Sequence, residues 1–302
     1  MGFPASGIGC GMYSDANDLV ARLLENYDSR YGLGYMSCSV YDTAWVANIT
    51  KTVAGVPQYL FPSSFYAILD AQLPHGSWSG HFHFGGLHGD GQMETLESAS
   101  HRLSDAILST MASLYTLVLH SKNRHQIRTS RLPLPTLETR ILCAEASLTS
   151  MLRQWQISTC NAVGFEVLAP ALLDLLSAEG FRFDFPDRTK LLKVRAAKLS
   201  RVKWDHLDRA APSALLHSME AFLGVDELDM RKFKQHLVGG SMMASPAATA
   251  AYLMKSPEWD DSAEAYLRLV IHCGDGHSSG AVPSAWPSTN FEMLWVSMIR
   301  VQ

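Results

Sequence analysis

The sequence lacks several features that would place it in a familiar class of protein. None of its apolar runs approaches the roughly 18–20 residues that a membrane-spanning helix needs, so we expect no membrane span. Charged residues make up only 18% of the chain, and the net charge is −4. A protein that binds nucleic acid usually presents a basic face, so we expect no nucleic-acid partner. The first residues show no basic or amphipathic targeting peptide, and we expect a cytoplasmic protein.

Cysteine is also scarce. The 302 residues include five cysteines, none of which forms a CxxC pair: Cys10, Cys38, Cys143, Cys160 and Cys273. Their odd number and wide spacing argue against a disulfide framework and against a structural zinc site, and they favour a reducing compartment.

Helical patterns dominate what is present. Apolar residues at helical spacing predict helices over about 103–119 and about 135–155. The run GFEVLAPALLDLLSAEG predicts another helix over 164–180, which Pro170 should kink or divide. Strictly alternating apolar and polar residues, the pattern of a half-buried strand, are absent. The sequence therefore predicts an all-α fold of helices joined by short turns.

Several further helix starts have recognisable caps. Ser14 or Asp15 can cap a lead helix near the N-terminus, and PSALLHSMEAFLG predicts a helix over 212–224. Two Ser-Pro pairs, Ser245-Pro246 and Ser256-Pro257, each place serine as the N-cap and proline in the first turn. We expect a helix to begin at each pair.

Residues 75–98, HGSWSGHFHFGGLHGDGQMETLES, interrupt the helical pattern and predict a long surface loop. Their histidines, His75, His81, His83 and His88, fit no spacing of a structural zinc site. A glycine-rich loop also does not hold ligands in a fixed geometry, so we assign no metal site there.

The segment SVYDTAWVA, residues 39–47, places a carboxylate and two large aromatic rings in a stretch otherwise apolar enough to be buried. A buried carboxylate without partners is costly, so we expect neighbouring groups to donate hydrogen bonds to Asp42. For Tyr41, Asp42 and Trp45 we favour a structural role over a catalytic one, because most buried polar groups are hydrogen-bonded parts of the framework.

This segment resembles the SxYDTAW signature of class II diterpene cyclases, and the resemblance extends in order from about residue 19 to 296. The matching blocks are SVYDTAW, GFEVLAPALLDLL, KLSRV followed by PSALLHSMEAFLG, GSMMASPAATAAYLM, and SSGAVPSAWPSTNFEMLWV. The sequence is most similar to the fungal members, many of which are bifunctional. The resemblance implies α/α-barrel-like domains called γ and β. Residues 1–35 would be the lead helix of β, 36–290 the γ domain, and 291–302 the start of the remaining β domain.

The activity that the resemblance implies is protonation-initiated cyclisation of geranylgeranyl diphosphate to a copalyl-type diphosphate. An alkene is a very weak base, so the acid must be a protonated carboxyl group in a dry site. The family supplies it from a DxDD motif in β, and this sequence contains no DxDD. We therefore interpret the chain as the N-terminal portion of a cyclase, inactive alone, that needs a β domain in cis or in trans.

The last residues agree with that interpretation. FEMLWVSMIRVQ contains no cap or turn signal, and we expect an exposed hydrophobic patch around Phe291, Leu294 and Trp295. The alternative is a non-catalytic helical module that binds a prenyl diphosphate or a partner cyclase.

Two residues match active-site positions of relatives, and two more are candidates for the same site. His217 matches the histidine of a proton-removing His-Asn pair in plant relatives, and Ser284 stands in the segment where its asparagine partner would fall. Lys198 matches a lysine that contacts the diphosphate, and Trp286 offers an aromatic face to a carbocation. For each residue a structural role stays open, as a hydrogen-bonded core histidine, a solvated lysine or a packed aromatic.

Magnesium is expected for the complete enzyme by the same resemblance. The acidic motif that plant relatives associate with magnesium and diphosphate is replaced here by residues 158–162, and Glu166 alone is nearby. Residues 260–264, DDSAE, fit a loose DDxxE pattern that binds magnesium in class I enzymes. Their place in the first turn of a helix favours interaction with the helix dipole instead, so we assign no metal ligand.

Overall fold

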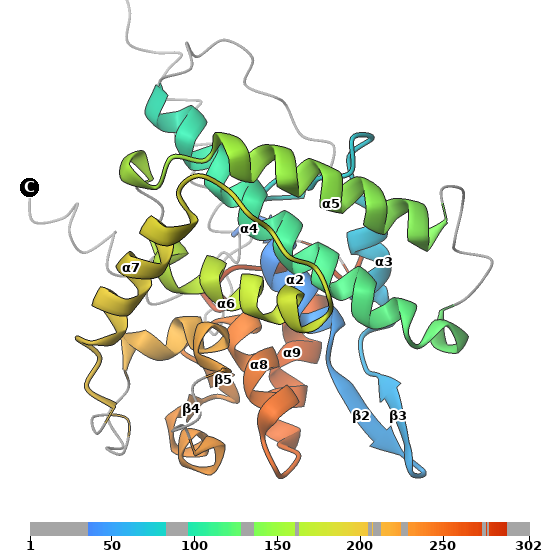
Figure 1. Ribbon diagram of the computed structural model, residues 1–302. Coiled ribbons are helices and arrows are strands. Elements are labelled where there is room, and N and C mark those ends of the chain that lie inside the picture. Colours follow the sequence, from blue (N-terminus) through green and yellow to red (C-terminus); the bar gives the residue numbers. More distant parts are fainter. Residues whose placement is uncertain are drawn as a thin grey trace, which may run out of the picture. The chain divides into compact units, whose positions relative to one another are not determined.

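The computed structural model describes most of the chain (Figure 1). The described residues are 36–82, 96–127, 136–160, 163–204, 207, 213–224, 229–273, 276 and 278–288. The predicted lead helix, the predicted patch around Phe291, Leu294 and Trp295, and the side chains of His83 and His88 lie outside them. The chain divides into two compact units, one of Met1–Tyr35 with Trp286–Gln302 and one of Met36–Ala285. The assignment of residues to γ and β domains stays a prediction.

The Met36–Ala285 unit consists mainly of helices. The α-helices are α2 (Val40–Ala47), α3 (Pro62–Asp70), α4 (Leu96–Ser121), α5 (Leu137–Gln154), α6 (Phe165–Ala178), α7 (Arg188–Leu199), α8 (Pro246–Lys255) and α9 (Asp261–Cys273). The 3₁₀ helices are η1 (Arg124–Gln126), η3 (Ile157–Thr159), η5 (Ala214–Phe222) and η6 (Met230–His236). This composition confirms the predicted all-α class. Among the described helices, none combines the length and hydropathy needed to cross a bilayer.

The short helix α2 occupies the middle of this unit. It packs against α3, α4 and α8, and Figure 1 shows it, in blue, surrounded by them. Seven of its eight residues are buried, including the polar Asp42 and Thr43, so almost every side of the helix faces the core rather than one stripe. The helices α5 and α6 pack against α4, and η5 packs against both α6 and α8.

Three short antiparallel strand pairs accompany the helices, and sequence reasoning missed all of them. They are β1 (Cys38–Ser39) with β6 (Val282–Pro283), β2 (Thr50–Val53) with β3 (Val56–Tyr59), and β4 (Leu237–Val238) with β5 (Ser241–Met242). The hairpin β2–β3 extends away from the helices in Figure 1. Its turn residues Ala54 and Gly55 have φ of 51° and 80°, as in the two-residue turns that suit hairpins. Both strands are largely exposed, so no alternating pattern marks them.

The amphipathic helices were predicted well. The expected helices over 103–119 and 135–155 correspond to α4 and α5, and α6 ends before Gly180, which has φ of 94°. Pro170 lies inside α6 but does not divide it. A proline removes one intrahelical hydrogen bond. The buried face of α6 includes Leu172, Leu173 and Leu176, and its packing keeps the helix continuous although this hydrogen bond is missing.

One of the two Ser-Pro predictions was wrong. Ser245 caps α8 as expected, and its Oγ accepts from the amide of Ala248 at 3.1 Å. Ser256 does not cap a helix, because α9 begins at Asp261. The carboxylate of Asp260 accepts from the amides of Ser262 and Ala263 at 3.0 and 3.2 Å. A carboxylate is an effective N-cap acceptor and also favours the positive end of the helix dipole, so Asp260 sets the helix start.

The predicted surface loop over 75–98 was also partly wrong. Trp78 is fully buried, and its Nε1 donates to the carbonyl of Ile68 at 2.8 Å. Gly76 has φ of 100°, and a Cβ there would lie 2.4 Å from the backbone of Cys143. Helix α4 already begins at Leu96. The glycines and serines of this stretch therefore include positions of close packing as well as loop positions.

Candidate functional site

The SVYDTAWVA segment joins several parts of the Met36–Ala285 unit. Ser39 caps α2 by accepting from the Asp42 amide at 3.2 Å. Thr43 Oγ1 donates to the Ser39 carbonyl at 2.7 Å and accepts from the Val282 amide of β6 at 3.0 Å. Helix α4 contributes Thr116, whose hydroxyl donates to a carbonyl of α2 at 3.0 Å. The polar residues of the segment therefore form hydrogen bonds within the core.

Asp42 links α2 to α8. Its carboxylate is 5% exposed, and Oδ1 accepts from the amide of Ala247, in the first turn of α8, at 3.3 Å. Burial raises the pKa of Asp42 to about 7, although hydrogen bonds from Ser39 and the Ala247 amide lower it. The Asp42 carboxyl thus bridges two helices, and its structural role stays a prediction.

Sequence reasoning missed a second buried acid, Glu220. The Tyr41 hydroxyl donates to Glu220 Oε1 at 3.1 Å, and this bond joins α2 to η5 across 179 positions of sequence. Glu220 is 3% exposed, and its Oε2 has no hydrogen-bond partner among the described residues. Burial, with the Asp42 charge, raises the pKa of Glu220 to about 8. The one available signal was a carboxylate inside the apolar run LLHSMEAFL.

Burial also raises the pKa of the Tyr41 phenol well above its usual value, and the charges of Glu220 and Asp42 add to the rise. The Trp45 ring lies next to it, with the two ring centroids 6.5 Å apart. Half-buried Tyr41 and the buried residues Asp42, Trp45 and Glu220 thus form one cluster, which we call the acid cluster.

His217 lies on the exposed side of η5. The backbone of this helix is non-helical at Ser218, where φ is −120° and ψ is 39°. The His217 Nδ1 lies 3.0 Å from the carbonyl oxygen of Met243. A carbonyl oxygen only accepts, so in the neutral ring this contact places the proton on Nδ1 and leaves the lone pair on Nε2. Among the described residues nothing occupies Nε2, so the exposed edge of the ring can accept a proton.

Lys198 lies on α7 and is paired. Its Nζ is 2.8 Å from Oε1 of Glu166 on α6, and the lysine side chain is 51% exposed. A second ion pair joins the same helices, from Arg195 Nη1 to Asp174 Oδ2 at 2.6 Å. The carboxylate of Glu166 partly neutralises Lys198, so an anion that reaches this lysine has to compete with Glu166.

The helices that carry Lys198 and His217 are neighbours of α6, against which both α7 and η5 pack. No direct contact joins the two side chains within the described residues. Ser284 is half-buried and follows β6 directly. Trp286 is 2% exposed and belongs to the unit that contains both termini. The structure therefore places α7, with Lys198, and η5, with His217, against the same helix α6.

The acidic run at 260–264 is occupied by structural interactions. Asp260 caps α9, and the Glu264 carboxylate contacts Lys51 Nζ at 2.6 Å and Arg268 Nε at 2.9 Å. Within the described residues, no group of three or more His, Cys, Asp or Glu could hold a metal ion. These residues do not fit a magnesium site, and magnesium stays a prediction for the complete enzyme.

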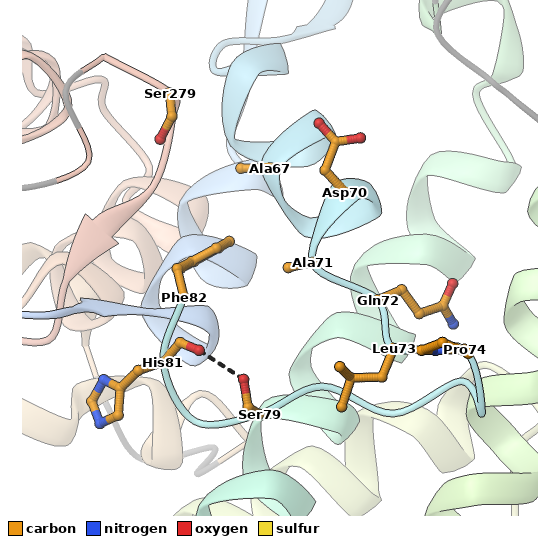
Figure 2. Close-up of a pocket in the computed structure, with 10 residues that line it drawn as sticks. All are labelled: Ala67, Asp70, Ala71, Gln72, Leu73, Pro74, Ser79, His81, Phe82 and Ser279. Atoms are coloured by element: carbon orange, nitrogen blue, oxygen red, sulfur yellow. Dashed lines mark hydrogen bonds between the residues drawn. The ribbon is translucent and has the colours of Figure 1, made fainter. Parts of the chain in front are cut away.

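A cavity of about 410 Å³ lies beside the end of α3 (Figure 2). Its lining includes Asp70, Gln72, His81 and Ser279, and none of the residues predicted for the active site. Figure 2 shows the carboxylate of Asp70 and the ring of His81 on opposite sides of the view, pointing away from each other. The cavity therefore offers no converging pair of acid and base.

Comparison with known proteins places the sequence among fungal relatives, although no family model matches it. It is 42% identical over 282 residues to a phyllocladan-16-alpha-ol synthase of Phomopsis amygdali, which covers 93% of this chain and 26% of that protein. It is 41% identical to a copalyl diphosphate synthase of Talaromyces verruculosus over 94% of this chain and 27% of that protein. The chain thus spans about a quarter of the length of these relatives.

Solved structures support the same relationship. Abietadiene synthase from Abies grandis matches with a TM-score of 0.68 and 27% identity, over 95% of this chain and 33% of that one. The ent-copalyl diphosphate synthase from Arabidopsis thaliana, solved with a geranylgeranyl thiolodiphosphate analogue, matches with a TM-score of 0.63 and 25% identity, over 95% and 36%. These matches confirm the predicted terpene synthase fold.

Proposed function

Because this chain is homologous over most of its length to fungal copalyl diphosphate synthases and bifunctional diterpene synthases, we propose that it forms one wall of a class II diterpene cyclase site. The substrate would be geranylgeranyl diphosphate and the product a copalyl-type diphosphate. The chain itself contains no DxDD motif. Under this proposal the protonating carboxylic acid comes from a further segment, in cis or in trans.

The observation that carries the proposal is the contact of His217 Nδ1 with the Met243 carbonyl, which leaves Nε2 exposed. Cyclisation begins when an acid protonates the terminal alkene, and it ends when a base removes a proton from the bicyclic cation to form a new alkene. The base must present a lone pair. In the neutral imidazole of His217 the contact with Met243 places the proton on Nδ1, so the exposed Nε2 would carry the lone pair and accept a proton directly or through a water.

Lys198, Ser284 and Trp286 have supporting roles in this proposal. Lys198 lies on α7, beside the α6 helix that also supports η5, and would contribute positive charge toward the diphosphate. Ser284 would stand at the position of the second proton-removing residue and could hydrogen-bond a water there. Trp286 would present an aromatic face to the carbocation.

The decisive experiment reconstitutes the cyclase. The purified chain is mixed with a polypeptide that carries the remainder of the Talaromyces verruculosus relative, outside the matched segment, and geranylgeranyl diphosphate is added. Product is dephosphorylated and identified by mass spectrometry. We expect no copalyl product from the chain alone and a copalyl product from the mixture. His217→Ala should lower the rate at least tenfold, while the exposed control His101→Ala should not.

Two outcomes would contradict the proposal. Copalyl product from the chain alone would mean that it contains its own acid. Binding of geranylgeranyl diphosphate with no product from any reconstituted mixture would favour the non-catalytic helical module instead.

A further inference from the structure

The acid cluster is the least explained feature of the core. Each buried ionisable group normally has its hydrogen-bonding capacity filled. Here Glu220 has one oxygen bonded to the Tyr41 hydroxyl and the other without a partner among the described residues. Leaving a buried carboxyl half satisfied is costly, so the arrangement calls for an account beyond packing.

The cluster is also close to the candidate base in the chain. Glu220 and His217 lie on the same 3₁₀ helix, on either side of the non-helical residue Ser218. One part of η5 is tied to α2 by the Tyr41–Glu220 hydrogen bond at 3.1 Å. The other part is tied to the turn after β5 by the His217–Met243 contact at 3.0 Å. A helix that is broken between two such contacts can change the direction of one side chain when the other contact changes.

We propose that Glu220, held by Tyr41, is a positioning residue that orients the His217 imidazole by fixing η5, and that ionisation of Glu220 displaces η5 and changes the orientation of the ring. The inference rests on the proposed function only for the claim that His217 accepts the final proton. The structural coupling between Glu220 and His217 stands on the contacts of η5 alone.

The surroundings of Glu220 set the direction of this coupling. Helices α6 and α8 and strand β5 pack against η5, α2 is bonded to it through Tyr41, and α7 packs against α6. Besides Glu220, the titratable and charged groups on these elements and on η5 are Tyr41, Asp42, Glu166, Asp174, Arg188, Lys190, Lys193, Arg195, Lys198, Tyr252, Lys255 and His217. Of the cations, Lys198 is paired with Glu166. No ion pair to Glu220 forms within the described residues, so only hydrogen bonds, including the one from the Tyr41 hydroxyl, favour a negative charge on it.

Burial and the Asp42 charge raise the pKa of Glu220 to about 8. Its carboxyl is therefore protonated at neutral pH and ionises as the solution becomes alkaline. An ionised Glu220 lies beside the acidic Asp42 in a site of low polarity, and it gains stability if η5 moves to admit water. The His217–Met243 contact on the same helix should then weaken.

The test is a pH titration of the whole chain followed on the His217 ring. Histidine ring nitrogens are labelled with ¹⁵N, and His217 is assigned by its absence from the His217→Gln spectrum. We expect the Nδ1-protonated tautomer at pH 7 and a second change in the His217 resonances between pH 7.5 and 9. Glu220→Gln, which keeps the shape but cannot ionise, should abolish that change. Glu258→Gln, at an exposed carboxylate, should leave it intact.

The result that overturns the proposal is equally direct. If wild type shows no alkaline change at His217, or if Glu220→Gln retains it, Glu220 does not act on His217. Tyr41→Phe provides a second test, because removal of the donor should shift the change to a different pH while the folded dispersion of the spectrum is kept. If Tyr41→Phe unfolds, Glu220→Gln alone decides the question.

An activity measurement separates this inference from the proposed function. In the reconstituted cyclase, Glu220→Gln should move the alkaline fall in kcat upward by one pH unit or more and leave KM within twofold. An unchanged kcat profile would overturn the inference even if the cyclase is active. If reconstitution gives no product, the proposed function fails, and the resonance experiment still decides the coupling.

Discussion

Replacement of Asp42 by asparagine tests how the buried carboxyl of α2 affects stability. The folded protein raises the pKa of Asp42 from 3.8 to about 7. Below pH 4 the carboxyl is protonated in both the folded and the unfolded chain. Between pH 4 and pH 7 the unfolded chain releases this proton while the folded chain keeps it. The folded state then binds more protons, so the free energy of unfolding falls as the pH rises.

The size of this effect follows from the same two values. A rise of about three units in the pKa of Asp42 corresponds to about 4 kcal/mol of unfolding free energy, because each unit contributes about 1.4 kcal/mol. Water that enters the site on ionisation reduces that figure, so we expect about 2–4 kcal/mol between pH 4 and pH 7. Asparagine keeps an oxygen to accept from the Ala247 amide but cannot ionise. Asp42→Asn should therefore lose this part of the pH dependence and become more stable than wild type at pH 8.

The assay is urea unfolding followed by circular dichroism at pH 4, 5.5, 7 and 8.5, with the free energy of unfolding compared between variant and wild type at each pH. Glu220 contributes a slope of the same sign, so the informative quantity is the difference between the two proteins. Asp184→Asn, at an exposed carboxylate, is the control and should run parallel to wild type. Parallel curves for Asp42→Asn would refute the reasoning.

Three further predictions concern single contacts. Ser245→Ala should reduce the free energy of unfolding by about 1 kcal/mol in urea titrations, because α8 loses its cap, whereas Ser256→Ala should change it by less than about 0.5 kcal/mol. Gly76→Ala should reduce the free energy of unfolding by about 2–4 kcal/mol, because its Cβ would meet the Cys143 backbone. Gly55→Ala has open space around its Cβ and should reduce the free energy of unfolding by less in the same urea titrations. Lys198→Met should change stability by less than about 1 kcal/mol, because the ion pair with Glu166 is half exposed, yet raise KM for geranylgeranyl diphosphate about tenfold in the reconstituted enzyme. An unaltered KM would argue against a diphosphate contact.

Local signals were enough to predict much of the helical framework. The apolar spacing of α4 and α5 and the Ser245-Pro246 start of α8 are properties of a few consecutive residues, and the structure follows them. The start of α9 was misplaced because the segment contains two possible N-caps, Ser256 and Asp260, four positions apart. Which of them lies close enough to bond depends on the direction in which the chain enters the helix. That direction is set by packing and cannot be read from the segment itself.

The candidate site was harder to predict because its decisive contacts are distant in sequence. The Tyr41–Glu220 bond spans 179 positions. The sequence alone indicated that Asp42 needs partners, but not that one of them is the Ala247 amide. The orientation of His217 likewise depends on Met243, a residue whose positive φ of 51° has no signature in the sequence. Resemblance pointed to His217 and Lys198. The structure added their contacts, with the Met243 carbonyl and the Glu166 carboxylate.

The pairing of Thr43 with Val282 has a bearing on how the chain is made. The two residues are 239 positions apart, and β1 pairs with β6 beside them. At the roughly 5–20 residues per second of ribosomal synthesis, Val282 is made on the order of 10–50 s after Thr43. During that interval the Thr43 hydroxyl lacks the Val282 amide as a donor, and β1 lacks its partner strand β6. The apolar segment that contains Thr43 is thus made early, and chaperones or transient contacts have to protect it until β6 has been synthesised.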